Sequence, residues 1–233
     1  MHGNFAGKSW WRELLAAPPK GYRLISPDMP GFGQSPGGNG FKPHIPGYAR
    51  SLARFLDHLG VERPVLVGHS FGTAIAIELA LRNPEAFPAM MLLSPTPLNG
   101  LHTPRYLEPI LESYRTDRRG LRRALKRTMR TRTPPYLDDL VAEAGMMHPA
   151  NFSGNARLIS DWSMDGQLRT YTNPVLVASG DRDTIVPPSS AEATARAFPN
   201  GAYARIDEAG HSPQIEAPEQ VRWLLSILLN RLG

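Results

Sequence analysis

The sequence predicts an α/β fold in which helices cover both faces of a mostly parallel sheet. Its length of 233 residues suits a single domain, and its 41% hydrophobic and 20% charged residues are typical of globular proteins. Short apolar segments alternate several times with segments of helical periodicity. The apolar segments show little inside-outside alternation, which is typical of strands buried on both faces of a parallel sheet.

Each predicted strand is a short apolar run that ends at a turn. In chain order these runs span residues 22–26, 64–68, 89–93, 174–178 and 203–206. The predicted helices have apolar residues at helical spacing, and Asn83 and Pro84 stop the second of them. They span residues 47–59, 73–81, 189–198 and 218–232.

Between Pro95 and Tyr171 the pattern changes to charged, helical sequence without a convincing strand. We therefore expect residues 96–171 to form a helical cap inserted over one end of the sheet. Residues 1–95 and 172–233 would then form the core.

One segment of the expected cap is strongly basic. Residues 115–132 hold nine basic side chains and one acidic side chain. Two interpretations stay open: a helix docked by its apolar face with its charges in water, or a surface that gathers anionic substrate or lipid headgroups. The apolar face consists of Leu121, Ala124, Leu125 and Met129.

The composition excludes several classes of protein. Cysteine is absent, which excludes disulfide frameworks, Cys-ligated zinc, iron–sulfur clusters and thiol nucleophiles. The net charge is +5, but residues 115–132 alone carry +8, and the −3 of the remainder argues against a nucleic-acid-binding protein. No apolar run approaches the ~18 residues of a transmembrane segment, and the first residues lack a secretory apolar core, so we expect a cytoplasmic protein.

A Gly-x-Ser-x-Gly sequence at residues 68–72 follows a predicted strand and precedes a predicted helix. In this context the turn holds Ser70 in a strained conformation with its hydroxyl exposed, and small residues two positions away on either side avoid a clash. The first amides of the following helix point to the same place, where the negative charge of an oxyanion develops. The sequence therefore predicts that Ser70 is a nucleophile.

A serine nucleophile requires a base and a group that orients the base. Asp181 and Asp183 follow one predicted strand, and His211 follows the next. The carboxyl ends of parallel strands meet at one edge of a sheet, so Ser70, Asp183 and His211 can converge there. Asp181 competes with Asp183 for the acidic role.

With these motifs the sequence resembles the α/β-hydrolase superfamily. The resemblance covers the chain except the cap, which varies freely in this superfamily, and it implies an α/β-hydrolase fold with a helical cap insertion. It favours Asp183 over Asp181, because the family places the acid three residues after a glycine. The motifs are His2-Gly3, the turn at 28–35, the Gly-x-Ser-x-Gly turn at 68–72, the loop at 180–183 and Gly-His-Ser-Pro at 210–213.

The resemblance implies a role for each of these residues. Ser70 is the nucleophile, His211 is the general base and then the general acid, and Asp183 fixes the imidazole tautomer. The main-chain amides of Asn4 and Phe71 form the oxyanion hole. An Asn after His-Gly is also similar to haloalkane dehalogenases, but their chemistry requires a carboxylate at the position of Ser70.

Acyl transfer is therefore the expected reaction. The sequence indicates a carboxylesterase-like serine hydrolase without a cofactor, acting on a small to medium ester or a lactone as its small-molecule partner. One open alternative is hydrolysis of a carbon–carbon bond by the same triad under a similar cap. The other is a catalytically silent ligand receptor, which the intact triad disfavours.

The other candidate residues have weaker signals. His69 is expected to be structural, and the histidines at 44, 58, 102 and 148 lack metal-ligand spacing, so no metal site is expected. No phosphate-binding or dinucleotide-binding glycine motif is present, so no nucleotide cofactor is indicated. The natural substrate and the oligomeric state stay open. Plausible pocket walls are Phe5, Met146, Met147, Trp162 and Val186.

The N-terminal region departs from the family pattern. In the family a buried central strand comes directly before His-Gly, and earlier strands come before that one, whereas here Met1 precedes His2. The resemblance therefore implies that these N-terminal strands are missing. It also implies a gap in the sheet between the strands ending near Ser26 and Gly68, and an untethered segment carrying Asn4.

Overall fold

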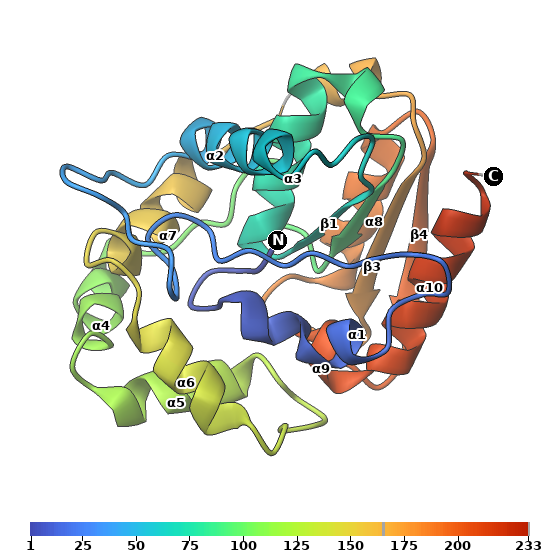
Figure 1. Cartoon of the computed structure of the whole chain (residues 1–233). Helices are drawn as coiled ribbons and strands as arrows, with labels where there is room; N and C mark the ends of the chain where they lie inside the picture. The colour runs from blue at the N-terminus through green and yellow to red at the C-terminus, as the bar shows by residue number, and fades with distance from the viewer. Residues whose placement is uncertain (165, 233) are drawn as a thin grey trace.

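A computed structural model describes residues 1–164 and 166–232 and contains a sheet of four parallel strands in the order β1-β2-β3-β4 (Figure 1). The register pairs Leu66 with Met90, Met90 with Val175, and Val175 with Gly201. The strands therefore start level, and their carboxyl ends lie along one edge of the sheet. The strands are β1 (Leu66–His69), β2 (Met90–Leu93), β3 (Val175–Gly180) and β4 (Gly201–Ile206).

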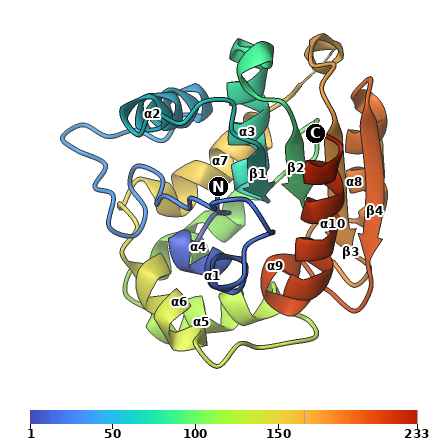
Figure 2. The ribbon, with the colours of Figure 1, turned by 45° about the vertical axis from the view of Figure 1, so that its right-hand side comes forward.

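Helices cover both faces of this sheet (Figures 1 and 2). Met90 and Leu92 of β2 belong to the apolar cluster that includes α2 (Ile45–His58), α3 (Phe71–Arg82) and α8 (Pro188–Ala197). Met91 and Leu93 belong to the cluster that includes α1 (Arg12–Ala16) and α10 (Pro218–Asn230). Successive side chains of a strand point to opposite faces, so β2, which is covered on both faces, has four apolar residues. The predicted α/β fold is confirmed.

Between β2 and β3 the described residues form helices and no strand. The helices are η3 (Arg105–Leu107), α4 (Glu108–Ser113), α5 (Arg118–Arg127), α6 (Leu137–Gly145), α7 (Asn151–Asp161) and η4 (Gln167–Thr170). Figures 1 and 2 show α4, α5 and α6 of this set beyond one end of the sheet. The cap boundaries at residues 96 and 171 stay a prediction.

The apolar face of α5 is buried. Leu121, Leu125 and Met129 share an apolar cluster with residues of α6, with Trp10 of η1 (Lys8–Trp11), and with Ile215 of α9 (Pro213–Glu216). The basic residues of α5 are left on its other sides, where they are exposed. The apolar face thus docks the helix as the pattern predicts.

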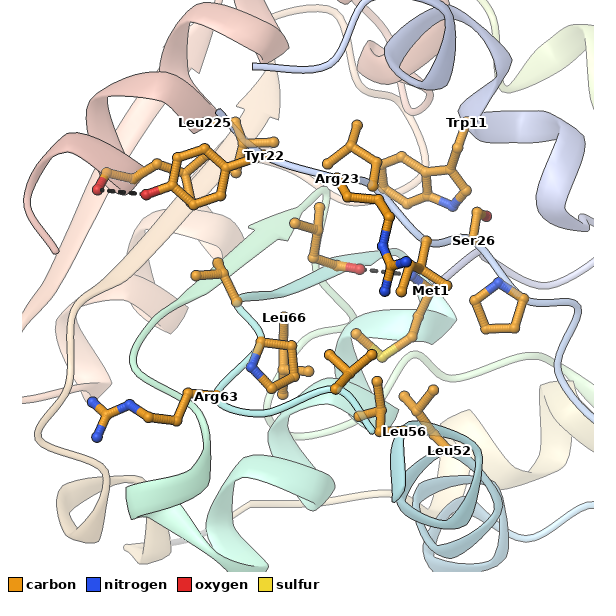
Figure 3. Close-up of a pocket in the computed structure, with 18 of the residues that line it drawn as sticks. Met1, Trp11, Tyr22, Arg23, Ser26, Leu52, Leu56, Arg63, Leu66 and Leu225 are labelled. Atoms are coloured by element: carbon orange, nitrogen blue, oxygen red, sulfur yellow. Dashed lines mark hydrogen bonds between the residues drawn. The ribbon is translucent and has the colours of Figure 1, made fainter. Parts of the chain in front are cut away.

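The predicted strand at residues 22–26 is wrong. Its one backbone hydrogen bond to another described residue is a turn, from Tyr22 N to Pro19 O. Between this segment and β1 lies a cavity of about 550 Å³, here called the apolar cavity (Figure 3). Without a neighbouring strand, the segment has no partner for its backbone groups, and β1 forms the edge of the sheet. The gap predicted between residues 26 and 68 is found at this place.

The expectation of an untethered N-terminal segment is wrong. The Met1 amino group donates to Val67 O at 2.6 Å, and His69 N donates to Met1 O at 3.1 Å. The buried ring of His2 accepts a hydrogen bond from Met29 N at 3.0 Å. Residues 1–3 are therefore fixed against β1 and the loop before α2. No described helix is long and apolar enough to cross a membrane.

Candidate active site

Ser70 lies at the turn between β1 and α3. Its φ is +50° and its ψ is −121°, a conformation that costs free energy for a residue with a side chain. Gly68 and Gly72 allow the turn, because a Cβ on Gly68 would lie 2.8 Å from Gly72 O, and a Cβ on Gly72 would lie 2.6 Å from His2 O. These contacts explain why the sequence needs glycine at both positions around Ser70.

Two threonines brace the strained turn, and sequence reasoning missed both. Thr73 Oγ1 donates to Ser70 O at 2.6 Å, and Thr96 Oγ1 donates to the same oxygen at 3.1 Å. Thr96 N also donates to Thr73 Oγ1 at 3.0 Å, which ties the loop after β2 to α3. No local sequence pattern indicates the role of Thr96, because its partners Ser70 and Thr73 follow a different strand.

The structure brings Ser70, His211 and Asp183 together at the carboxyl ends of the strands. His211 Nε2 lies 2.9 Å from Ser70 Oγ, and His211 Nδ1 lies 2.8 Å from Asp183 Oδ2. His211 and Asp183 are buried, at 5% and 7% exposure. Asp181 is exposed, and its carboxylate accepts a hydrogen bond from Ala209 N instead. The geometry therefore joins His211 to Asp183 and not to Asp181.

The Asp183 carboxylate is held in its ionised form. Burial alone would raise the pKa of Asp183, but the hydrogen bond and charge of His211 and the amides of Val186 and Ile185 outweigh burial and lower this pKa below its ordinary value. Both amides donate to Oδ1, at 3.0 Å and 2.9 Å, which leaves Oδ2 for His211. An ionised carboxylate in this place can orient the imidazole and stabilise its protonated form.

The loop that carries His211 is held from two sides. The His69 ring donates from Nε2 to His211 O at 2.7 Å, and it is buried, which agrees with the structural role expected of it. On the other side, Glu216 Oε1 accepts from Gly210 N at 2.9 Å and from Ser212 N at 3.2 Å. The residues directly before and after His211 thus share one carboxylate oxygen.

The second oxygen of Glu216 reaches the segment between α5 and α6. Glu216 Oε2 accepts from the amide and the hydroxyl of Thr131, at 2.9 Å and 3.0 Å. Sequence reasoning missed Glu216, because the capping-box pattern places a glutamate three residues after a serine, and here it lies four after Ser212. Glu216 therefore links the His211 loop to the helices beyond the sheet.

The segment after His2-Gly3 passes beside the nucleophile. A Cβ on Gly3 would lie 3.3 Å from Ser70 Cβ, and Phe5 has a φ of +52°, so the chain turns sharply after Asn4. The amides of Asn4 and Phe71 donate no hydrogen bond to any described residue. Phe71 is the first residue of α3, where backbone N–H groups have no partner within the helix. Both predicted oxyanion donors are therefore free to bind a ligand.

A buried polar chain holds the Asn4 side chain. Asn155 Nδ2 on α7 donates to Asn4 Oδ1 at 3.0 Å, and Asn155 Oδ1 accepts from the Tyr48 hydroxyl at 3.3 Å. The same hydroxyl lies 3.0 Å from Asn151 Oδ1. Asn151 and Asn155 are fully buried, and sequence reasoning missed both, because nothing in the α7 sequence marks two asparagines as partners of residues in other elements.

The predicted pocket walls lie in different surroundings. The Phe5 ring packs between Tyr114 and Phe152, with both centroid distances 5.8 Å. None of the five residues lines the apolar cavity, and their role stays a prediction. Met147 and Trp162 are in the main apolar cluster, Val186 is buried beside Asp183, and Met146 is 54% exposed at the end of α6.

The described residues contain no group of three His, Asp or Glu side chains arranged to hold a metal ion. The walls of the apolar cavity in Figure 3 are mainly aliphatic and aromatic side chains, unlike the polar surroundings of Ser70. The polar groups that converge on one point are those around Ser70. We therefore take the carboxyl edge of the sheet as the candidate active site.

Comparison with known proteins identifies the family. The chain is 25% identical to a pimeloyl-[acyl-carrier protein] methyl ester esterase of Aromatoleum aromaticum, over 97% of this chain and 94% of the relative. It is 28% identical to a 2-hydroxymuconate semialdehyde hydrolase of Pseudomonas putida, over 89% and 76%. A thermophilic esterase from Thermogutta terrifontis shares the fold, with a TM-score of 0.83 at 23% identity, over 99% of this chain and 88% of that one. The sequence model described as alpha/beta hydrolase fold matches residues 1–137 and 142–218, and the chain therefore belongs to this family.

Proposed function

We propose that this protein is a serine hydrolase that cleaves small to medium carboxylic esters, or lactones, through an acyl-enzyme. One observation carries the proposal: the His211 ring lies 2.9 Å from the Ser70 hydroxyl and 2.8 Å from the Asp183 carboxylate. A neutral serine becomes an effective nucleophile when a base takes its proton, and the base works best when a third group fixes its orientation.

In the first half of the reaction Ser70 Oγ attacks the carbonyl carbon, and His211 Nε2 takes the hydroxyl proton. Asp183 accepts a hydrogen bond from His211 Nδ1 and stabilises the imidazolium that forms. The amides of Asn4 and Phe71 donate to the oxyanion of the tetrahedral intermediate, a contribution of ~10²- to 10³-fold for one such donor. The intermediate collapses when His211 gives its proton to the leaving alcohol.

In the second half water attacks the acyl group on Ser70. His211 now takes a proton from the water and returns it to Ser70 Oγ as the ester bond to the enzyme breaks. The products are the free carboxylic acid and the original serine. No step requires a group beyond the five residues named and the water.

A second candidate function is hydrolysis of a carbon–carbon bond. It is favoured by the relative named 2-hydroxymuconate semialdehyde hydrolase, which is 28% identical to this chain. Ester cleavage is supported by the relative named a methyl ester esterase, whose match covers more of both chains. The Ser70, His211 and Asp183 arrangement suits both reactions, so turnover decides between them.

The test combines a panel of p-nitrophenyl esters of short and long acyl chains with a fluorophosphonate probe. We expect turnover of the shorter esters and labelling of wild type, and neither in Ser70→Ala, whose folding is checked by circular dichroism. Labelling without ester turnover favours the carbon–carbon reaction. Absence of both labelling and turnover in a folded protein contradicts a serine hydrolase and favours a ligand receptor.

A further inference from the structure

A second hollow of about 520 Å³ lies between α4 and α5, and we call it the basic cleft. Figures 1 and 2 show both helices beyond the end of the sheet, with α6 beside α5. One wall comes from the end of α4 and the residue after it, and includes Ser113 and Tyr114. The other wall comes from α5 and the residues after it. Its cationic members are Arg123, Lys126, Arg127 and Arg130.

The cleft has an excess of positive charge. Asp117 is the one carboxylate among the described residues that line it. Its Oδ1 caps α5 by accepting from Gly120 N at 2.7 Å, and its Oδ2 lies 3.8 Å from Arg123. Lys126, Arg127 and Arg130 form no ion pair with the described residues. Basic residues in the last turn of a helix are favourable for its dipole, which accounts in part for Lys126 and Arg127. It does not account for Arg130, which lies beyond the end of α5.

Both walls of the cleft reach residues next to the proposed catalytic groups. The Cγ and Cβ of Arg130 would lie 2.8 Å and 3.0 Å from a Cβ on Gly210, so the Arg130 stem packs on the residue before His211. On the other wall, the Tyr114 ring packs on Phe5, the residue after Asn4. The cleft therefore adjoins the His211 loop and the proposed oxyanion segment.

We propose that the basic cleft binds an anionic group of the substrate, so that the preferred substrates are esters carrying a carboxylate or a phosphate. This inference rests on the proposed function. Arginine presents several N–H donors in a planar fork that matches the oxygens of either anion. The cations of the cleft that form no ion pair with the described residues, Lys126, Arg127 and Arg130, raise the local concentration of anionic ligand. An ester held at Ser70 would direct its anionic end toward Arg127 and Arg130.

The test uses two esters of equal length, p-nitrophenyl hexanoate and the mono-p-nitrophenyl ester of adipic acid, which differ by a terminal carboxylate. The measured quantity is the ratio of kcat/KM for the anionic ester to that for the neutral ester. In wild type at low salt we expect this ratio to exceed about 10, and to fall when the ionic strength is raised to about 0.5 M. The p-nitrophenyl ester of 6-phosphonooxyhexanoic acid forms a second arm and tells which anion is preferred.

The cleft variant is Arg127→Gln/Arg130→Gln, and the matched control is Arg118→Gln/Arg119→Gln. The control removes the same charge from the first turn of α5, and neither of its residues lines the cleft. We expect the ratio to fall about tenfold in the cleft variant and less than twofold in the control. Equal ratios in wild type and the cleft variant overturn the inference, and so does an equal fall in both variants.

Failure of the inference differs from failure of the proposed function. If neutral ester is hydrolysed without preference for an anion, the proposed function stands and the inference is wrong. If no ester is hydrolysed and the fluorophosphonate does not react, the proposed function fails, and calorimetric titration with adipate and with inorganic phosphate tests the cleft alone. Binding that is weakened in the cleft variant and kept in the control supports the cleft, and absence of binding overturns it.

Discussion

The two hollows of this molecule have nearly equal volumes, about 550 Å³ and 520 Å³, and opposite chemistry. The apolar cavity lies against the edge of β1 and is lined mainly by aliphatic and aromatic side chains (Figure 3). The basic cleft lies beside the loops that carry His211 and Asn4. The two volumes therefore do not distinguish the hollows, and our proposal rests on the position of the basic cleft beside the carboxyl ends of the strands.

The largest expected effect is a loss of kcat that differs between two neighbouring carboxylates, Asp183 and Asp181. Asp183→Asn keeps the shape of the side chain but removes the charge that orients His211, so we expect kcat to fall by ~10³- to 10⁴-fold. Asp181→Asn is the matched control, with an expected loss below about fivefold, because Asp181 is exposed and does not contact His211. Steady-state kinetics of both variants with one ester decides, and the reverse ranking would show that Asp181 is the acid.

The next effect concerns the polar chain from α7 to the oxyanion segment. Asn155→Ala removes the donor to Asn4 Oδ1, so the proposed oxyanion amide of Asn4 loses its fixed position. We expect kcat to fall about tenfold with KM changed less than twofold, since a loss confined to the transition state lowers kcat. Tyr48→Phe should have a smaller effect, because the Asn155 amide stays in place.

The binding of a boronic acid, whose serine adduct mimics the tetrahedral intermediate, separates this role from a general structural one. Its affinity should fall in Asn155→Ala by the same factor as kcat/KM, while the affinity for the carboxylic acid product stays unchanged. An equal loss of affinity for both ligands would mean that Asn155 supports the fold and not the oxyanion site.

The sequence predicts those residues of the candidate site whose neighbours along the chain form a recognisable pattern. Ser70 needs glycines two positions away on either side, and His211 and Asp183 each follow an apolar strand, so all three are visible along the chain. Glu216 and Asn155 are not visible in this way, because their partners Thr131 and Asn4 lie 85 and 151 residues away. Residues 22–26 were predicted as a strand because their composition suits one, but a strand also requires a neighbour.

The apolar cavity should influence stability and not activity. Leu225 lies on α10, is 2% exposed and lines this cavity, so Leu225→Ala should lower the free energy of unfolding by about 2–4 kcal/mol. Trp223→Ala on the same helix is the control, since Trp223 is 64% exposed and should change stability by less than about 1 kcal/mol. We expect kcat within twofold of wild type in both, measured below the unfolding transition. A large loss of kcat in Leu225→Ala would contradict the claim that the apolar cavity influences stability and not activity.

A further expected effect is on acid stability near Ser70. Burial lowers the pKa of His2 to about 4 and the pKa of His69 to about 3, from ordinary values of 6.5. Below pH 6.5 the unfolded chain therefore binds protons that the folded chain does not, and stability falls by up to about 1.4 kcal/mol per group for each pH unit. Tm measured by calorimetry should decrease from pH 7 to pH 4.5. A constant Tm over this range would mean that the two rings are not held neutral.

The most direct test of the account is to trap the acyl-enzyme. Wild type in steady-state turnover of a p-nitrophenyl ester is quenched in acid, digested and analysed by mass spectrometry, with Ser70→Ala treated in parallel. We predict an acyl group on Ser70 in wild type and no acyl group in Ser70→Ala. Turnover without an adduct on Ser70 in wild type, or an adduct on another residue, would contradict the account.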